Sequence, residues 1–414
     1  MPLRRLQIPA VILVIATLAA LYGWAVVLLT PSHPGAIGYN LNALGTDWMV
    51  FYGGARRLID GHLATLFDGA RFTAYLNTTF APWLTQPMPY RPWVYPPSYL
   101  FIVAPFGTLP FTTAYIAFQI ATAALLAAAL WFGADRPRAR PLVVAAALLG
   151  PAAAINVGMG QNAFLTAALL VGGLRLVTTR PALGGALLGL LTMKPQFWLL
   201  VPVALAAARQ WRALLWSVIA AAGLALASAT VFGLDAWRHW IELARGSYGD
   251  RHGQWVELGR LWGDSLYACL VSAGASQGLA NALQVLGTLL GAGLVYRAFR
   301  LPLPTDQKIA ILLAATVFAA PHSSLADTVL LATAAGLWAG AAAAQGDASL
   351  AKWTLALALW LAEIFNPPLV TPFGALTPLL ILGFIAMSLA GAPRASVISP
   401  AAPTPSPQLA RTRR

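Results

Sequence analysis

The first amphipathic stretch of the chain reads GTDWMVFYGGARRLIDG, from Gly45 to Gly61. Asp47 stands at its start, where exposed backbone N–H groups and the helix dipole favour a carboxylate, and Gly61 supplies a C-terminal stop. The pattern predicts a helix that lies along a membrane surface instead of crossing the membrane. At helical spacing, one face gathers the apolar side chains Trp48, Phe51, Tyr52, Ala55 and Leu58.

The composition of the whole chain is that of an integral membrane protein. Of its 414 residues, 59% are hydrophobic and only 9% are charged, whereas roughly a quarter of the residues in a soluble domain are charged. Many apolar runs approach the roughly 20 residues that a helix needs to cross a bilayer. The alternation expected of a membrane β-barrel is not visible. We therefore expect an all-α, polytopic transmembrane protein.

The formal net charge of +13 does not predict nucleic-acid binding, because the arginines are scattered through short loops between apolar runs. The positive-inside rule explains much of this excess. Cys269 is the single cysteine, so an internal disulfide and a cysteine-based metal site are both excluded.

The arginine positions order the chain into one polytopic membrane domain, residues 1–392, with about 11–13 crossings and a cytoplasmic N-terminus. Residues 31–98 and 233–278 form two large extracytoplasmic loops with interfacial helices. Residues 393–414, rich in Pro, Ser and Ala, are expected to form a disordered cytoplasmic tail. The predicted crossings lie near or within residues 8–29, 99–131, 141–157, 161–177, 182–194, 195–208, 212–232, 279–297, 308–320, 324–342, 350–365 and 371–391.

This topology places Asp47, Arg91, Gln161 and Lys194 on the external side, although it was fitted mainly to arginines. Asp47 has two interpretations: a helix cap only, or a partly desolvated general base at the membrane surface. Lys194 precedes Pro195 between apolar segments. An ionisable group at that depth favours a functional role over a side chain that merely reaches the headgroups.

Two more ionisable groups interrupt apolar sequence near residue 320. His322 follows Pro321, and Asp327 would lie within the next crossing, where a carboxylate needs a partner; His322 is one candidate. Arg56 and Arg91 have the guanidinium geometry that suits a phosphate, although arginines near headgroups also serve as anchors. The glycines of Gly158–Asn162 predict a tight turn between crossings and no nucleotide loop.

Taken in order, these stretches resemble glycosyltransferase family 87, the polytopic mannosyltransferase-like enzymes of the GT-C superfamily. The resemblance covers roughly residues 45–330. One departure is Ser-Leu-Ala-Asp, ending at Asp327, where the family has a tyrosine before the acid. The matching stations are Asp47 with its aromatic helix and Leu66-Phe67-Asp68, Val94-Tyr95-Pro96-Pro97, Asn156–Asn162, Gly189–Gln196 followed by Arg209–Arg212, and Pro321-His322 ahead of Asp327.

The resemblance implies a polyprenyl-phosphate sugar as donor, a lipid or glycan as acceptor, an extracytoplasmic site, and inversion at the sugar carbon without a cofactor or a required metal. It makes Asp47 the base. It implies a donor-phosphate site with the residues Arg91, Lys194 and His322. It implies further substrate contacts from Arg56, Tyr95, Gln161, Asn162, Gln196 and Asp327.

Two other functions fit parts of the sequence. A transporter or flippase of a lipid-linked glycan would also have broken helices and charge within the membrane, but it predicts two inverted halves and no internal repeat is visible. A non-catalytic membrane scaffold leaves Lys194 and Asp327 unexplained. The sequence therefore favours a hexosyltransferase, with mannose as the family-level expectation for the sugar.

Overall fold

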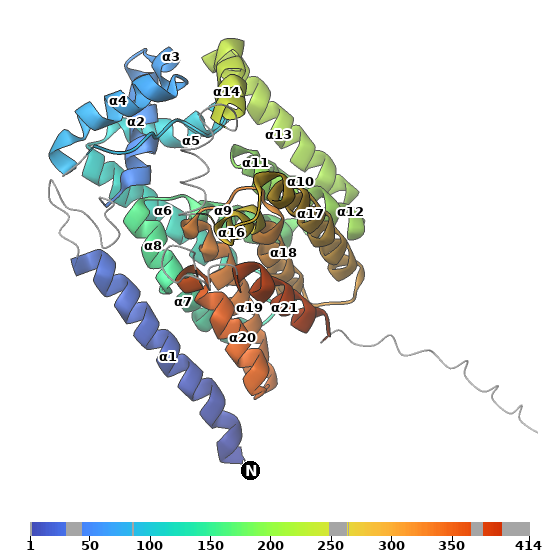
Figure 1. The fold of residues 1–414 in the computed structure, drawn as a ribbon. Helices are drawn as coiled ribbons and strands as arrows, with labels where there is room; N and C mark the ends of the chain where they lie inside the picture. The colour runs from blue at the N-terminus through green and yellow to red at the C-terminus, as the bar shows by residue number, and fades with distance from the viewer. Residues whose placement is uncertain are drawn as a thin grey trace, which may run out of the picture.

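The computed structural model describes residues 2–29, 44–84, 87–247, 263, 265–365 and 376–390 (Figure 1). Within these ranges all the regular elements are helices, and an isolated β-bridge joins Gly263 to Ser324. The predicted all-α class is therefore confirmed. The predicted tail, residues 393–414, lies outside the described residues.

Five helical segments are long and apolar enough to cross a membrane: α1 (Pro2–Leu29), α6 (Phe111–Trp131), α13 (Trp211–Phe232), α17 (Gln277–Arg300), and η6 (Leu325–Thr328) with α19 (Val329–Gln345). A sixth is possible by length if α7 (Arg140–Leu148) and α8 (Pro151–Met159), bent by 48° at their junction, act as one span. The other apolar helices are shorter: α9 (Ala163–Leu176), α10 (Pro181–Gly189) with η5 (Leu190–Met193), α11 (Pro195–Trp198) with α12 (Val201–Ala207), α18 (Thr305–Ala319), α20 (Leu350–Trp360) and α21 (Leu376–Ala390).

The described chain thus has fewer helices of membrane length than the predicted number of crossings. Proline accounts for two of the interruptions, because it cannot donate the helical hydrogen bond and it clashes with the preceding turn. Pro151 starts α8 after the bend, and Pro195 starts α11 after η5. The order of apolar segments nevertheless follows the prediction from α1 to α21.

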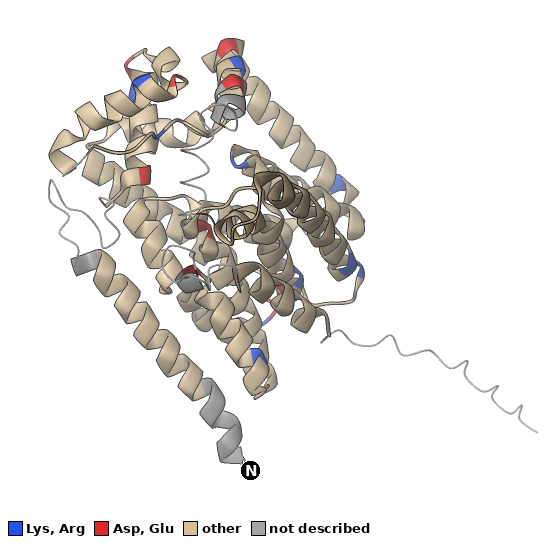
Figure 2. Cartoon of the chain, in the orientation of Figure 1, with Lys and Arg blue, Asp and Glu red and all other residues tan. Residues whose placement is uncertain are grey.

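The helices run alternately between two ends of the bundle. α6 and α9 lie side by side and parallel, because Gln119 bonds to Gln161 near one end and Arg175 bonds to Ala129 near the other. We call these the Asp47 end and the Arg175 end. Figure 2 shows that much of the helical length between them carries no charged residue.

The Arg175 end is held by a buried ion pair. Arg175 Nη2 lies 2.6 Å from Asp306 Oδ1, and its Nη1 donates to the carbonyl oxygens of Ala129 and Leu130 in the last turn of α6. Asp306 also accepts a hydrogen bond from the backbone N–H of Asp135. This cluster therefore joins α6, α9 and the first turn of α18.

The helix predicted over Gly45–Gly61 forms as α2 (Thr46–Ile59), and Gly61 follows it with φ 76°. Its predicted position along a membrane surface stays a prediction, but the helix is not an open amphipathic one, because residues 46–51 and 53–55 are buried within the protein. The glycines admit close neighbours: a Cβ at Gly53 would lie 2.5 Å from Leu76 Cδ2, and one at Gly54 2.3 Å from Trp93. α2 is therefore packed into the Asp47 end of the protein.

Smaller helices cover this end: α3 (Leu63–Leu66), α4 (Gly69–Thr79), α5 (Leu100–Val103), α14 (Leu234–Ser247) and α16 (Leu266–Ser272), with the 3-10 turns η2 (Pro97–Tyr99) and η3 (Ala104–Thr108). α14 is amphipathic, and Figure 1 shows it near α5. Its Trp240 Nε1 donates to the Val94 carbonyl at 3.1 Å. This bond ties α14 to the loop between α4 and η2.

Candidate active site

Asp47 lies in the first turn of α2 and is 8% exposed. Each of its carboxylate oxygens has a polar partner. Arg91 Nη1 lies 3.3 Å from Oδ1, and Gln161 Nε2 donates to Oδ2 at 2.9 Å. The carboxylate is therefore oriented by two side chains from separate parts of the chain, in a largely buried setting with limited solvent access.

The turn between α8 and α9 delivers Gln161 to this carboxylate. Gly160 has φ 74°, a conformation that L side chains rarely adopt, and a Cβ there would lie 2.4 Å from Trp48 Cβ. The Gly45 N–H donates to the Gly158 carbonyl at 2.8 Å, which fixes the turn to the start of α2. The tight turn predicted from these glycines is confirmed, and it also brings two segments into close contact.

Tyr95 lies on the other side of Gln161. Its hydroxyl donates to Gln161 Oε1 at 3.4 Å, and its ring stacks on Tyr99 with centroids 4.4 Å apart. Burial raises the pKa of the Tyr95 phenol well above its usual range, and the negative charges of Asp327 and Asp47 raise it further. The phenol therefore keeps its proton and remains a neutral hydrogen-bond donor to Gln161.

The second carboxylate belongs to a buried ion pair. Lys194 Nζ lies 2.7 Å from Asp327 Oδ1, and Asp327 Oδ2 accepts from the backbone N–H and the hydroxyl of Ser324 at 2.9 and 3.0 Å. Lys194 occupies the break between η5 and α11, whereas Asp327 lies in η6. The predicted need of Asp327 for a partner is confirmed, but the partner in this ion pair is Lys194, because the fold brings that break against η6.

His322 lies in the segment between α18 and η6 and is partly buried. Burial lowers the pKa of its imidazole, and the nearby charge of Lys194 lowers it further, while that of Asp327 opposes the shift. The imidazole is therefore neutral at neutral pH. It can donate or accept a hydrogen bond close to the Lys194–Asp327 pair, but it supplies no positive charge there.

A comparison with known families gives the family of the chain. The model of glycosyltransferase family 87 matches residues 93–321, which is more than half of the chain. The chain belongs to glycosyltransferase family 87. The matched range includes Tyr95, Gln161 and Lys194, whereas Asp47 and Asp327 lie outside it. No curated protein and no solved structure matches the chain.

Membership in family 87 settles the function class that the sequence left open between transfer and transport. The protein is a membrane glycosyltransferase, with several apolar helices of membrane length. Its substrates are accordingly a glycosyl donor and an acceptor that reach the enzyme in or at the membrane.

Two of the predicted site residues do not join the cluster around Asp47 in this family 87 enzyme. Arg56 lies near the other end of α2, about 14 Å along the helix axis at 1.5 Å per residue. It pairs with Asp60 Oδ1 at 2.8 Å and donates to the Gly107 carbonyl. Gln196 is partly exposed in the first turn of α11, two residues after Lys194. By contrast, Asn162 is buried and donates to the Tyr99 hydroxyl at 2.9 Å.

Sequence reasoning missed several polar residues that support the site. Gln119 of α6 donates to the Gln161 carbonyl and accepts from Asn156 Nδ2, both at 3.0 Å. Asn156 Oδ1 in turn accepts the Ala163 N–H. Glu363, 2% exposed in η7 (Ala362–Phe365), lies where this turn packs against α8 and η6. The sequence did contain a signal for these residues. A polar side chain within an apolar helix is rare, and it usually forms hydrogen bonds to other parts of the protein or contributes to function.

Proposed function

We propose that this family 87 enzyme transfers a hexose, with mannose as the first sugar to test, from a polyprenyl-phosphate donor to a lipid or glycan acceptor. The transfer takes place on the extracytoplasmic side and inverts the anomeric carbon, with Asp47 as general base. The observation that carries the proposal is the Asp47 carboxylate, which is nearly buried yet oriented by Arg91 and Gln161.

In the proposed reaction the acceptor hydroxyl donates its proton to Asp47 as its oxygen attacks the anomeric carbon. The bond from that carbon to the phosphate oxygen breaks, and its electron pair leaves with the lipid phosphate. A carboxylate whose rotamer is fixed by two hydrogen bonds suits this task, because general-base catalysis needs the carboxylate oxygen within about 3 Å of the hydroxyl oxygen.

The departing phosphate gains negative charge, which hydrogen-bond donors and positive charges would stabilise. Arg91 Nε has no hydrogen-bond partner among the described residues, so this arginine retains donor capacity beyond its bond to Asp47. Lys194 Nζ carries three protons and uses one toward Asp327. Together with the neutral imidazole of His322, these groups provide the proposed electrostatic stabilisation of the leaving phosphate.

The distribution of basic residues supports an extracytoplasmic site. At the Asp47 end, the ion pairs match each of six Lys or Arg residues with a nearby acid: Arg56, Arg57, Arg71, Arg91, Lys194 and Arg238. The positive-inside rule places the end with more Lys and Arg in the cytoplasm. Helix order puts more of them at the Arg175 end: Arg136, Arg138, Arg140, Arg175, Arg180, Arg209, Arg212, Arg297, Arg300, Lys308 and Lys352.

The test is transfer of radiolabelled mannose from a polyprenyl-phosphate donor into lipid or glycan by membranes that contain the protein. Wild type, Asp47→Asn and Asp60→Asn are compared at matched expression. Asp60 is the control because it belongs to the same helix region but pairs with Arg56 and Arg57 away from the site. We expect loss of transfer in Asp47→Asn and near wild-type transfer in Asp60→Asn.

The outcomes separate the parts of the proposal. Wild-type turnover that persists in Asp47→Asn removes Asp47 as the base. Turnover with a different polyprenyl-phosphate sugar, and none with mannose, overturns the sugar while leaving the base intact. Turnover only with a nucleotide-sugar donor overturns the donor class.

A further inference from the structure

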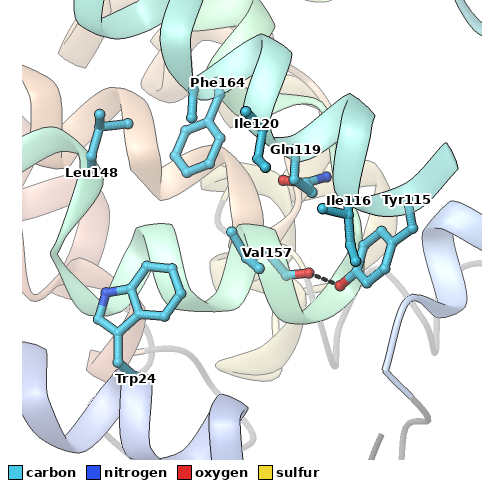
Figure 3. Close-up of a pocket in the computed structure, with 9 residues that line it drawn as sticks. Trp24, Tyr115, Ile116, Gln119, Ile120, Leu148, Val157 and Phe164 are labelled. Carbon is cyan, nitrogen blue, oxygen red and sulfur yellow. Dashed lines mark hydrogen bonds between the residues drawn. The ribbon is translucent and has the colours of Figure 1, made fainter. Parts of the chain in front are cut away.

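A cavity of about 310 Å³ lies between α1, α6 and α8 (Figure 3). Figure 3 shows Trp24 of α1 facing the α6 side chains across it, with Val157 of α8 between them. No charged residue is among the nine that line it. These are Trp24, Tyr115, Ile116, Gln119, Ile120, Ala123, Leu148, Val157 and Phe164.

The polar atoms of the lining are turned away from the cavity and bonded within the protein. Gln119 uses its amide toward Gln161 and Asn156, and the Tyr115 hydroxyl donates to the Val157 carbonyl. Trp24 Nε1 donates to the Leu149 carbonyl at 3.0 Å. A buried water needs about two to four polar partners, so this cavity favours an apolar occupant.

The cavity opens toward the surroundings of two helices that can cross a membrane. Ile116 and Ile120, on α6, are 52% and 63% exposed. Trp24 lies within the apolar window Ala10–Val27 of α1. What faces these side chains in a bilayer is hydrocarbon, and the volume is roughly ten times the ~30 Å³ that a water molecule takes in the liquid. It therefore accommodates a short length of hydrocarbon chain.

We infer that the cavity binds one acyl chain of a membrane phospholipid and that this chain supports Gln119, the residue that holds the Gln161 backbone. The cavity opens beside the exposed Ile116 and Ile120 of α6, a helix of membrane length, where the bulk hydrocarbon of a bilayer is the acyl chain of phospholipids, and this abundance is why we assign a phospholipid chain in preference to a polyprenyl tail. The alkyl part of Gln119 forms the cavity wall while its amide bonds to Gln161 and Asn156. A chain in the cavity thus packs directly behind the polar network of Asp47.

The test uses the full chain reconstituted in phosphatidylcholine vesicles that contain a small fraction of phosphatidylcholine with a photoreactive diazirine on one acyl chain. After irradiation, labelled peptides are mapped by mass spectrometry. Phe164 is the diagnostic position, because it is only 2% exposed and lines the cavity. Labelling of Ile116 and Ile120 is not diagnostic, since bulk lipid reaches them directly.

Two neighbouring alanines provide a matched pair of variants. Ala123→Phe fills the cavity, whereas Ala124→Phe adds the same side chain at an exposed position of α6 outside the lining. We expect labelling at Phe164 in wild type and Ala124→Phe, and a decrease of about tenfold in Ala123→Phe, equivalent to about 1.4 kcal/mol. Ala123→Leu repeats the test with a smaller side chain, in case the phenylalanine disturbs folding.

Equal labelling of Phe164 in wild type and in both Ala123 variants overturns the inference, as does its absence in wild type. An excess of unlabelled polyprenyl phosphate should leave the signal unchanged. If polyprenyl phosphate abolishes it, the donor tail is the occupant and the phospholipid assignment is wrong. None of these readouts requires glycosyl transfer, so the result is independent of the proposed reaction.

Discussion

Removing Lys194 should separate the structural role of its ion pair from its proposed role at the donor phosphate. Lys194 and Asp327 are both buried, and their charged atoms lie 2.7 Å apart. Lys194→Met leaves the carboxylate of Asp327 without its cation, while the hydrogen bonds from Ser324 remain. We expect this single substitution to destabilise the protein strongly and to abolish transfer.

The separation of 2.7 Å between Lys194 Nζ and Asp327 Oδ1 allows an estimate of how much Lys194→Met destabilises the protein. At an effective dielectric constant of about 20, two unit charges at that distance attract by about 6 kcal/mol, most of which offsets their desolvation. Breaking such a pair on one side costs about 3–5 kcal/mol. With an unfolding entropy of about 2.1 cal/mol/K per residue over 414 residues, 4 kcal/mol corresponds to a decrease in Tm of about 5 °C.

The double variant Lys194→Met/Asp327→Leu makes the prediction specific. Because an apolar pair of similar volume often replaces a buried ion pair without loss, Tm should return to within about 2 °C of wild type. Transfer should remain absent, because the Lys194 ammonium that donates hydrogen bonds to the leaving phosphate is gone. The assays are thermal unfolding in detergent and radiolabelled transfer. If the double variant recovers both Tm and transfer, Lys194 has no role at the phosphate; if the single variant unfolds like wild type, the ion pair itself is refuted.

Gly160→Ala should lower transfer about 100-fold, the effect of a displacement of about 1 Å at a catalytic group, because its Cβ would lie 2.4 Å from Trp48 Cβ and shift the turn that carries Gln161. Gly172→Ala, whose Cβ would lie 3.6 Å from Ala129, should keep activity in the same assay. Burial lowers the pKa of His322, so its contribution to stability is complete above about pH 6.5 and is lost as the pH falls toward the lowered pKa. His322→Gln should therefore lose less Tm than wild type between about pH 8 and about pH 5; equal losses would contradict this account.

The sequence predicted which residues share one end of the bundle better than it predicted their contacts. Apolar runs and arginine positions placed Asp47 and Gln161 at the same end, and the structure joins them by a hydrogen bond across 114 residues of sequence. Periodicity cannot predict such a pair, because it gives the face of each helix and no information on which helices meet. The partner of Asp327 shows the same limit: His322 was the nearby candidate, but Lys194, 133 residues away, forms the ion pair.

The burial of α2 was missed for a different reason. Gly53 and Gly54 have no side chain, so a hydrophobicity pattern assigns them to the solvent-exposed face of the helix. In the structure they are the positions where Leu76 and Trp93 pack most closely. A glycine on a helix is compatible with a solvent-exposed surface or with a side chain packed closely against the backbone, and only the tertiary structure distinguishes the two. The same argument applies to Gly160 beside Trp48.

The surroundings of Tyr95 indicate how the proposed reaction would use both ion pairs. An in-line displacement places the base and the leaving group on opposite sides of the reacting carbon. Different elements hold the two ion pairs, Asp47 with Arg91 and Lys194 with Asp327. In addition to burial, the charges of both carboxylates raise the pKa of Tyr95. The neutral phenol donates to Gln161, which itself bonds to Asp47, and so it adds no charge to either centre. In the proposed mechanism the two pairs therefore have separate roles, with proton transfer at Asp47 and charge stabilisation of the phosphate at Lys194.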